Sequence, residues 1–270
     1  MRLLTPYVLL RNQLDYPLRR LLRFPREVRG VRPAGLDSAL TSLDADARAR
    51  ALAFVERYEL RPLVARGRRR DVLENLYYLD LLLTAFERGG VELPAQRVEA
   101  VDVGVSDWFY APALAAALRR WRSDEPRRLE VLGFEADPGR RYADGYTRED
   151  WAAWYRADLD GLRYVPEDAR RWRGVVDVAL MLFPFLFARD LDRWGLPRSF
   201  HRPRELLAHV WSLVRPGGSL VVANQGEAER DEQLRHFAAL GISVASTGHF
   251  ASPFFAYDVE RYLHVARRPV

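Results

Sequence analysis

Carboxylates and small residues stand where the sequence predicts strands to end, and these side chains are the best placed for ligand chemistry. A glycine directly after a strand lets a ligand approach the backbone, and the amides that open the next helix can bind an anion. A carboxylate that ends a second strand can accept hydrogen bonds from two ribose hydroxyls, or it can simply cap the following turn. The residues at such positions are Asp102, Gly104, Ser106, Asp107, Glu135 and Asp168.

Other catalytic chemistries have less support in the sequence. The chain has no cysteine, which excludes disulfides, cysteine nucleophiles and thiolate metal sites. Its five histidines show no metal-ligand spacing, so we expect no metal site. No phosphate-binding P-loop and no G-x-S-x-G nucleophile motif is present. Phe183 and Pro184 follow another apolar run and either border a ligand or belong to the core.

Short apolar runs alternate with helical patterns in the last two thirds of the chain. This alternation predicts a mostly parallel α/β sheet covered by helices on both faces. The last two runs leave no room for a helix between them, so we expect an antiparallel hairpin. The strand-like runs are 97–103, 129–134, 162–165, 175–181, 220–223, 242–247 and 259–265, and the helical patterns are 111–122, 148–158, 204–214 and 229–240.

The first part of the chain has a different pattern. Residues 36–95 read as helices, the last of them over 71–88 before Gly89-Gly90, so we divide the chain into a helical region 1–95 and an α/β domain 96–270. Pro17 and Pro25 predict a short segment around the basic, apolar run 18–24. That segment is either an arm packed on its own domain or a basic amphipathic turn on an anionic membrane.

Composition narrows the class of protein. The 270 residues are 49% hydrophobic and 29% charged, which is typical of a globular domain. All 42 basic residues are arginine and Ile242 is the only isoleucine, a bias that indicates a GC-rich, bacterial-type coding sequence. The net charge of +5 is modest for this length, so we expect no nucleic-acid partner. No run approaches the ~20 apolar residues of a membrane span, and residues 1–10 lack a small-residue cleavage site, so we expect a cytoplasmic protein.

Over about 97–270 the order of these residues resembles the class I S-adenosylmethionine-dependent methyltransferase family. In that family an acidic residue and a glycine-rich loop after the first strand hold the methionine part of the cofactor, and Asp102 and Gly104 stand there, followed by Ser106 and Asp107. The resemblance implies that Glu135 binds the ribose and Asp168 the adenine. The Pro216-Gly217-Gly218 turn and the closing hairpin also match. The family loop is commonly G-x-G-x-G, whereas here serine and tryptophan replace the second and third glycines.

The resemblance implies a Rossmann-like seven-stranded sheet and an S-adenosylmethionine-dependent methyltransferase that acts on a small-molecule acceptor. We expect the N-terminal helical region 1–95 to form an arm and a cap that covers the acceptor pocket. It identifies neither the acceptor, nor a catalytic residue, nor the oligomeric state. The glycine-poor loop leaves a second hypothesis open, a catalytically inactive interaction or regulatory module. A dinucleotide enzyme is a third choice, because Gly104 and Glu135 are 31 residues apart rather than ~20.

Overall fold

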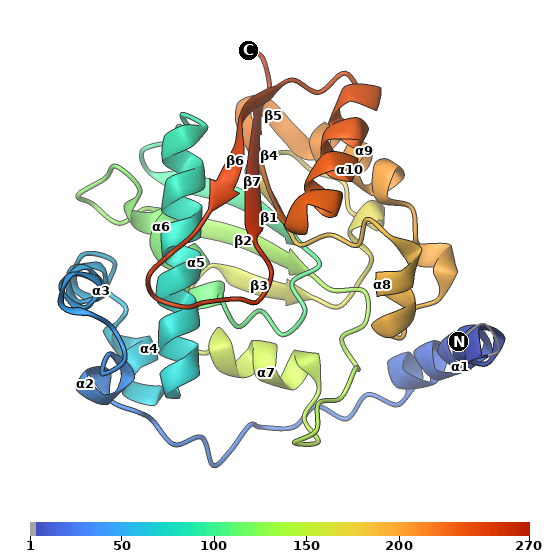
Figure 1. The fold of residues 1–270 in the computed structure, drawn as a ribbon, viewed down its shortest axis with the longest axis horizontal. Coiled ribbons are helices and arrows are strands. Elements are labelled where there is room, and N and C mark those ends of the chain that lie inside the picture. The colour runs from blue at the N-terminus through green and yellow to red at the C-terminus, as the bar shows by residue number, and fades with distance from the viewer. Residues whose placement is uncertain (1–3) are drawn as a thin grey trace.

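Seven strands form one mixed sheet in the part of the chain that the computed structural model describes, residues 4–270 (Figure 1). Their order is β3-β2-β1-β4-β5-β7-β6, and only β7 runs antiparallel to its neighbours. This confirms the predicted Rossmann-like fold with its C-terminal antiparallel hairpin. The strands are β1 Arg97–Val103, β2 Arg128–Phe134, β3 Leu162–Val165, β4 Val176–Leu182, β5 Val214–Gln225, β6 Val244–Phe250 and β7 Arg261–Arg267.

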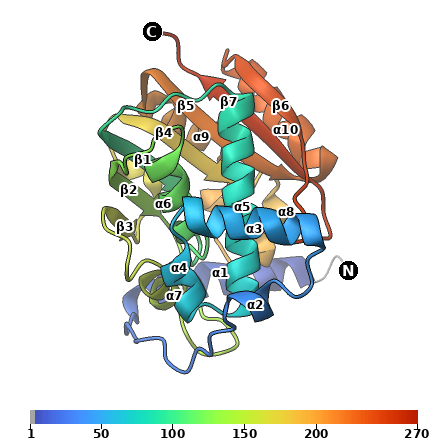
Figure 2. The same cartoon turned by 90° about the vertical axis from the view of Figure 1, so that its left-hand side faces the viewer.

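Helices cover both faces of the sheet, as predicted. Figures 1 and 2 show α5 and α6 on one face, with α3 crossing over α5, while α9 and α10 lie on the other face. Two apolar clusters fill the two interfaces. The helices are α1 Leu4–Leu21, α2 Leu36–Ala39, α3 Ala45–Arg57, α4 Arg61–Arg66, α5 Arg69–Arg88, α6 Ala111–Arg120, α7 Arg148–Tyr155, α8 Ala188–Arg193, α9 Pro203–Leu213 and α10 Gly226–Ala239, with short 3-10 helices at Ala169–Arg171 (η1) and Arg198–Phe200 (η2).

The predicted ends of β5 and β6 differ from the observed ones. β5 begins six residues earlier than expected, because Val214 already pairs with Val176 before a bulge that contains the Pro-Gly-Gly turn. β6 begins two residues later, because Ile242 closes the preceding helix instead. Its amide donates to the carbonyl of Phe237, and its side chain is buried in the α9–α10 cluster.

Helix α5 packs as part of the α/β core. Its side chains join those of α2, α3, α6 and the sheet in one apolar cluster. Asn75 fixes its position, since its side-chain amide donates to the carbonyl of Phe109 and accepts from the amide of Ala113 at the start of α6. The division of the chain into two domains at residue 95 remains a prediction. In the structure, side chains from both parts pack in one apolar core.

Helix α1 corrects the expectation of a short segment bounded by Pro17. It continues through this proline to Leu21, so only the hydrogen bond that the missing amide would make is lost. Three inward side chains anchor the helix: Asn12 donates to the carbonyl of Asp192, Tyr16 donates to that of Ala136, and Arg19 pairs with Asp137. The prediction for residues 1–10 lies partly outside the described residues. Within residues 4–270, no helix is long and apolar enough to cross a membrane.

Candidate functional site

A cavity of about 880 Å³ lies at the carboxyl edge of the sheet, where open α/β sheets bind their ligands. The ends of β1, β2, β4 and β5 and the segment after β3 all contribute to its wall. Five of the six predicted site residues line this cavity, and Asp102 does not. The five are Gly104, Ser106, Asp107, Glu135 and Asp168.

The loop after β1 keeps a left-handed backbone at each position where the family has glycine. The φ angles are +81° at Gly104, +55° at Ser106 and +51° at Trp108. A non-glycine residue in this region costs about 1–3 kcal/mol unless its surroundings hold it there. Here the amide of Ser106 donates to Glu135 and its carbonyl accepts from Tyr164. The sequence therefore departs from the glycine pattern, while the backbone has the positive φ that glycine adopts most readily.

Trp108 explains how this loop accommodates a large side chain. The indole is fully buried and lies 2.8 Å from where Gly133 would carry a Cβ, so the glycine in β2 makes room for it. Its Nε1 donates to the carboxylate of Asp102 at 3.0 Å, and the hydroxyl of Tyr110 donates to the same oxygen at 2.9 Å. Asp102 is completely buried beneath the loop, and burial raises its pKa to about 7. Asp102 thus supports the loop from below.

Substitution of Ser106 tests whether the loop stores backbone strain. We expect Ser106→Val to lower the free energy of unfolding by about 1–3 kcal/mol, because a β-branched residue is poorly tolerated at positive φ. Ser106→Gly should change it by less than ~1 kcal/mol, since relief of strain offsets the greater chain entropy of glycine. Urea denaturation measures both. Ser212→Val on the exposed side of α9 is the matched control. An equal loss of unfolding free energy at both sites would contradict backbone strain at Ser106.

Glu135 is held by protein groups on both carboxylate oxygens. Its Oε2 accepts from the amide of Ser106 at 2.8 Å, and its Oε1 accepts from the amide of Asp137 at 2.7 Å and from Arg148 at 2.8 Å. Glu135 and Arg148 are 5% and 3% exposed, so they form a buried ion pair. The guanidinium of Arg148 also faces the ring of Trp194 at 5.0 Å.

Sequence reasoning missed Arg148, although it correctly predicted the helix that Arg148 opens. Thr147 and Asp150 form a capping box that begins α7 at this arginine. Burial of an arginine in an N-terminal helical turn is unusual, because the helix dipole favours negative charge there. The negative charge of the Glu135 carboxylate compensates for the buried positive charge of Arg148. No signal within the sequence around Arg148 points to a partner 13 residues earlier.

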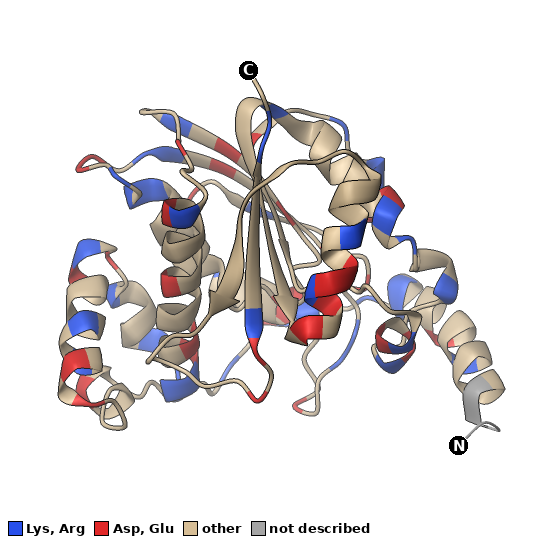
Figure 3. Ribbon diagram, turned by 45° about the horizontal axis from the view of Figure 1, so that its top comes forward, with Lys and Arg blue, Asp and Glu red and all other residues tan. Residues whose placement is uncertain are grey.

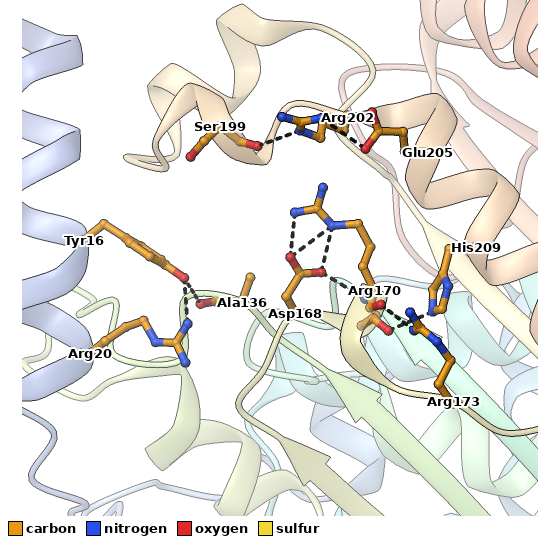
Figure 4. Close-up of polar contacts among 11 residues, drawn as sticks. Tyr16, Arg20, Ala136, Asp168, Arg170, Arg173, Ser199, Arg202, Glu205 and His209 are labelled. Atoms are coloured by element: carbon orange, nitrogen blue, oxygen red, sulfur yellow. Dashed lines mark hydrogen bonds and ion pairs between the residues drawn. The ribbon is translucent and has the colours of Figure 1, made fainter.

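Asp168 is also paired with an arginine. It caps η1 by accepting from the amide of Arg170, and the guanidinium of Arg170 approaches its second oxygen to 2.6 Å (Figure 4). This pair is partly exposed, unlike that of Glu135. Figure 4 also shows Tyr16 of α1 reaching the carbonyl of Ala136, so the N-terminal helix borders this end of the site. The two carboxylates expected at the ribose and the adenine therefore both have arginine partners within the chain.

The opposite end of the cavity is lined by α5, which belongs to the N-terminal helical region that we expected to cover the acceptor pocket. Asp71 accepts from the hydroxyl of Tyr155 at 2.8 Å and pairs with Arg68. Tyr78 stacks on Tyr110 with ring centroids 4.8 Å apart. The other residues at this end include Glu74, Phe109, Phe183 and Pro184. Of the two positions expected for Phe183 and Pro184, the structure shows the one that borders the cavity.

The cavity is acidic although the chain carries a net charge of +5. Eight acidic residues and six arginines contribute to its wall. Asp107 is one of the acidic residues, and burial raises its pKa to about 6, against the lowering effects of Tyr142 and Arg148. The formal charge of the wall is nevertheless negative, because its acidic residues outnumber its arginines. This balance favours a ligand with positive charge.

Comparison with known proteins gives matches of the fold only. No family model matches the chain, and no curated protein matches it by sequence. Magnesium protoporphyrin IX methyltransferase from Synechocystis PCC 6803, with bound SAM, is 14% identical with a TM-score of 0.48, over 84% of this chain and 99% of that chain. The [4+2]-cyclase SpnF is 15% identical with a TM-score of 0.48, over 70% and 81% of the two chains. A SAM-dependent methyltransferase from Aquifex aeolicus is 14% identical with a TM-score of 0.46, over 72% and 97%.

The shared feature is the fold. Two of these three structures are of methyltransferases, and the similarity to them is one of fold at 14% sequence identity.

Proposed function

We propose that this chain is an S-adenosylmethionine-dependent methyltransferase acting on a small-molecule acceptor. The observation that carries the proposal is the loop after β1, whose backbone is left-handed at all three glycine positions of the family pattern. This loop adjoins the carboxylate that ends β2, in a cavity rich in acidic residues. The resemblance of the sequence supports the same assignment.

The residues of the cavity fit this cofactor. Nothing lies within 4 Å of a Cβ built on Gly104, so the backbone there is open to a ligand. Oε2 of Glu135 accepts only one hydrogen bond, from Ser106, which leaves it a lone pair for a ribose hydroxyl. We assign the methionine part to the Gly104–Ser106–Asp107 loop, the ribose to Glu135 and the adenine to Asp168. When bound, the cofactor supplies a methyl group on a positively charged sulfur.

The chain itself contributes binding, alignment and exclusion of water at such a site. The acidic wall stabilises a cationic ligand, and the ion pairs of Glu135 and Asp168 hold both carboxylates in fixed positions. The aromatic groups of Tyr78, Phe109 and Phe183 give the α5 end an apolar wall suited to the acceptor. We assign no proton-transferring residue.

A thermal-shift measurement tests cofactor binding directly. At about 100 times its dissociation constant, S-adenosylmethionine or S-adenosylhomocysteine should stabilise the folded chain by ~2.7 kcal/mol, which raises the melting temperature by about 5–10 °C. We expect Gly104→Leu to abolish the shift, because its side chain would project into the open space beside the loop.

Gly241→Leu is the matched control for this experiment. Gly241 also has a positive φ and nothing within 4 Å of a built Cβ, but it lies outside the cavity. Its variant should show the same backbone strain and keep the full ligand-induced shift. Equal shifts in both variants would place the ligand elsewhere on the molecule.

A non-catalytic module is the second candidate, and one observation favours it. Both carboxylates assigned to the cofactor are already paired with arginines of the chain, so a ligand must share or displace these partners. If millimolar S-adenosylmethionine and S-adenosylhomocysteine leave the melting temperature of the wild-type protein unchanged, this second candidate is the better one.

A further inference from the structure

Helix α1 has an apolar face that points away from the rest of the protein. Residues spaced by three and four lie on one side of a helix, and on α1 these include five large apolar residues that are 52–80% exposed: Tyr7, Leu10, Leu14, Leu18 and Leu21. The opposite face carries Asn12, Tyr16 and Arg19, which hold the helix to the protein. Figure 1 shows α1 at the periphery, beside α8. The apolar face continues into the exposed residues Leu22 and Phe24.

The segment that contains α1 carries an excess of positive charge. Residues 1–30 contain seven arginines and two acidic residues, which gives +5, and this equals the net charge of all 270 residues. The other 240 residues are therefore neutral overall. Helices such as α3 and α10 have interspersed arginines and carboxylates instead (Figure 3). The apolar face of α1 is thus accompanied by an excess of positive charge.

An open groove adjoins this face. It has a volume of about 610 Å³ and lies between α1 and residues 139–141. Its wall combines the apolar side chains of Leu18, Leu22 and Phe24 with four arginines and one aspartate. Within residues 4–270, the guanidinium groups of four arginines of this region have no carboxylate within 4.0 Å: Arg20, Arg26, Arg140 and Arg141. Two of these four, Arg140 and Arg141, line the groove, which therefore offers positive charge without an ion pair beside apolar surface.

We propose that α1 and this groove form a docking surface for an anionic phospholipid bilayer. Such a bilayer presents negative headgroups directly above apolar chains, the complement of what α1 presents. Nucleic acid offers the negative charge without the apolar part. A second copy of the chain in a two-fold interface would place the same positive segment against itself. The inference does not depend on methyl transfer.

Vesicle flotation tests the proposal. We expect the wild-type protein to float with vesicles of equal parts phosphatidylserine and phosphatidylcholine at least tenfold more than with phosphatidylcholine alone. Binding should fall when salt is raised from about 0.1 M to about 1 M, where the screening length drops from ~10 to ~3 Å. The variant Leu10→Glu/Leu18→Glu should bind roughly a hundredfold more weakly, about tenfold for each leucine that leaves the apolar phase. Arg26→Gln/Arg141→Gln should lose most of the preference for phosphatidylserine.

The matched control is Val175→Glu/Val259→Glu, which adds the same charges at exposed apolar positions outside α1. This variant should bind as the wild type does, and thermal melting should show that all variants fold. Wild-type protein that ignores phosphatidylserine, or a leucine variant that binds as well as wild type, would overturn the proposal. So would a wild-type dimer that the leucine variant converts to monomer without any vesicle binding, because that result identifies a second copy as the partner.

Discussion

Replacing Glu135 with alanine is expected to lower the free energy of unfolding by about 3–5 kcal/mol, because the change leaves a buried arginine without its partner. Arg148 is 3% exposed and pairs with this carboxylate at 2.8 Å. The amides of Ser106 and Asp137 lose their acceptor in the same variant. The melting temperature should fall by about 10 °C.

Two further variants identify the cause of this loss. Asp168→Ala removes a carboxylate that is also paired with an arginine at the cavity, but this pair is partly exposed, so we expect a loss of only about 1 kcal/mol. The double variant Glu135→Gln/Arg148→Met removes the buried charge pair as a whole and should recover much of the stability. Urea denaturation measures all three. A loss in Glu135→Ala no larger than that in Asp168→Ala would contradict the buried-pair explanation.

The same pair affects how cofactor binding is tested. Glu135→Ala should weaken S-adenosylmethionine binding as well as stability, because the variant removes the proposed ribose acceptor and loosens Ser106. The binding loss is expected to be about 1–3 kcal/mol, the scale of a hydrogen bond to a charged group. Calorimetry below the melting temperature of the variant separates the two effects, and unchanged affinity there would exclude Glu135 from the ribose site.

The second large effect concerns the pH dependence of stability and Asp102. Burial raises the pKa of this carboxyl from its ordinary value of 3.8 to about 7. An acid with a higher pKa in the folded chain binds its proton more readily when folded, so stability is lost as the pH rises from about 4 to about 7 and is constant above that. Each pH unit in this interval corresponds to about 1.4 kcal/mol. The free energy of unfolding of Asp102→Asn, taken relative to that of the wild type, should therefore rise by about 4 kcal/mol between pH 4 and pH 8.

The difference between variant and wild type isolates this residue. Asp107 acts in the same direction, since burial raises its pKa to about 6, whereas His264 acts in the opposite direction, since burial lowers its pKa to about 4. Both groups are common to the two proteins and cancel in the difference. Urea denaturation at several pH values measures it, and Asp46→Asn on the exposed side of α3 controls for the substitution itself. A difference that stays constant from pH 4 to pH 8 would contradict a raised pKa for Asp102.

The sequence was sufficient for the architecture because the architecture depends on local patterns. Apolar runs at 97–103 and 162–165 predicted β1 and β3 with their observed ends. The short spacing before the last run predicted the antiparallel hairpin. Pro17 shows the limit of such reasoning, because a proline removes one helical hydrogen bond, while the contacts of Tyr16 and Arg19 with distant loops keep α1 continuous.

For the candidate site, too, the sequence predicted some features and not others. Strand ends are local, so the sequence could place Gly104, Ser106, Asp107, Glu135 and Asp168 at one edge of the sheet, where they line one cavity. Pairing is not local. The arginine partner of Glu135 stands on the next helix, and although the N-terminal helical region was expected to cover the pocket, its sequence did not indicate which side chains of α5 reach the cavity.

By itself, therefore, the sequence determined the order of the strands along the chain, the small and acidic residues at their ends and the absence of thiol chemistry. Only the tertiary structure decided that Trp108 turns inward over Gly133, that Asp102 is buried beneath the loop, and that α1 exposes its apolar face. The physical reason is that periodicity records which face of an element is apolar, whereas the partner that covers this face, or leaves it open, is set by packing between segments far apart in the chain.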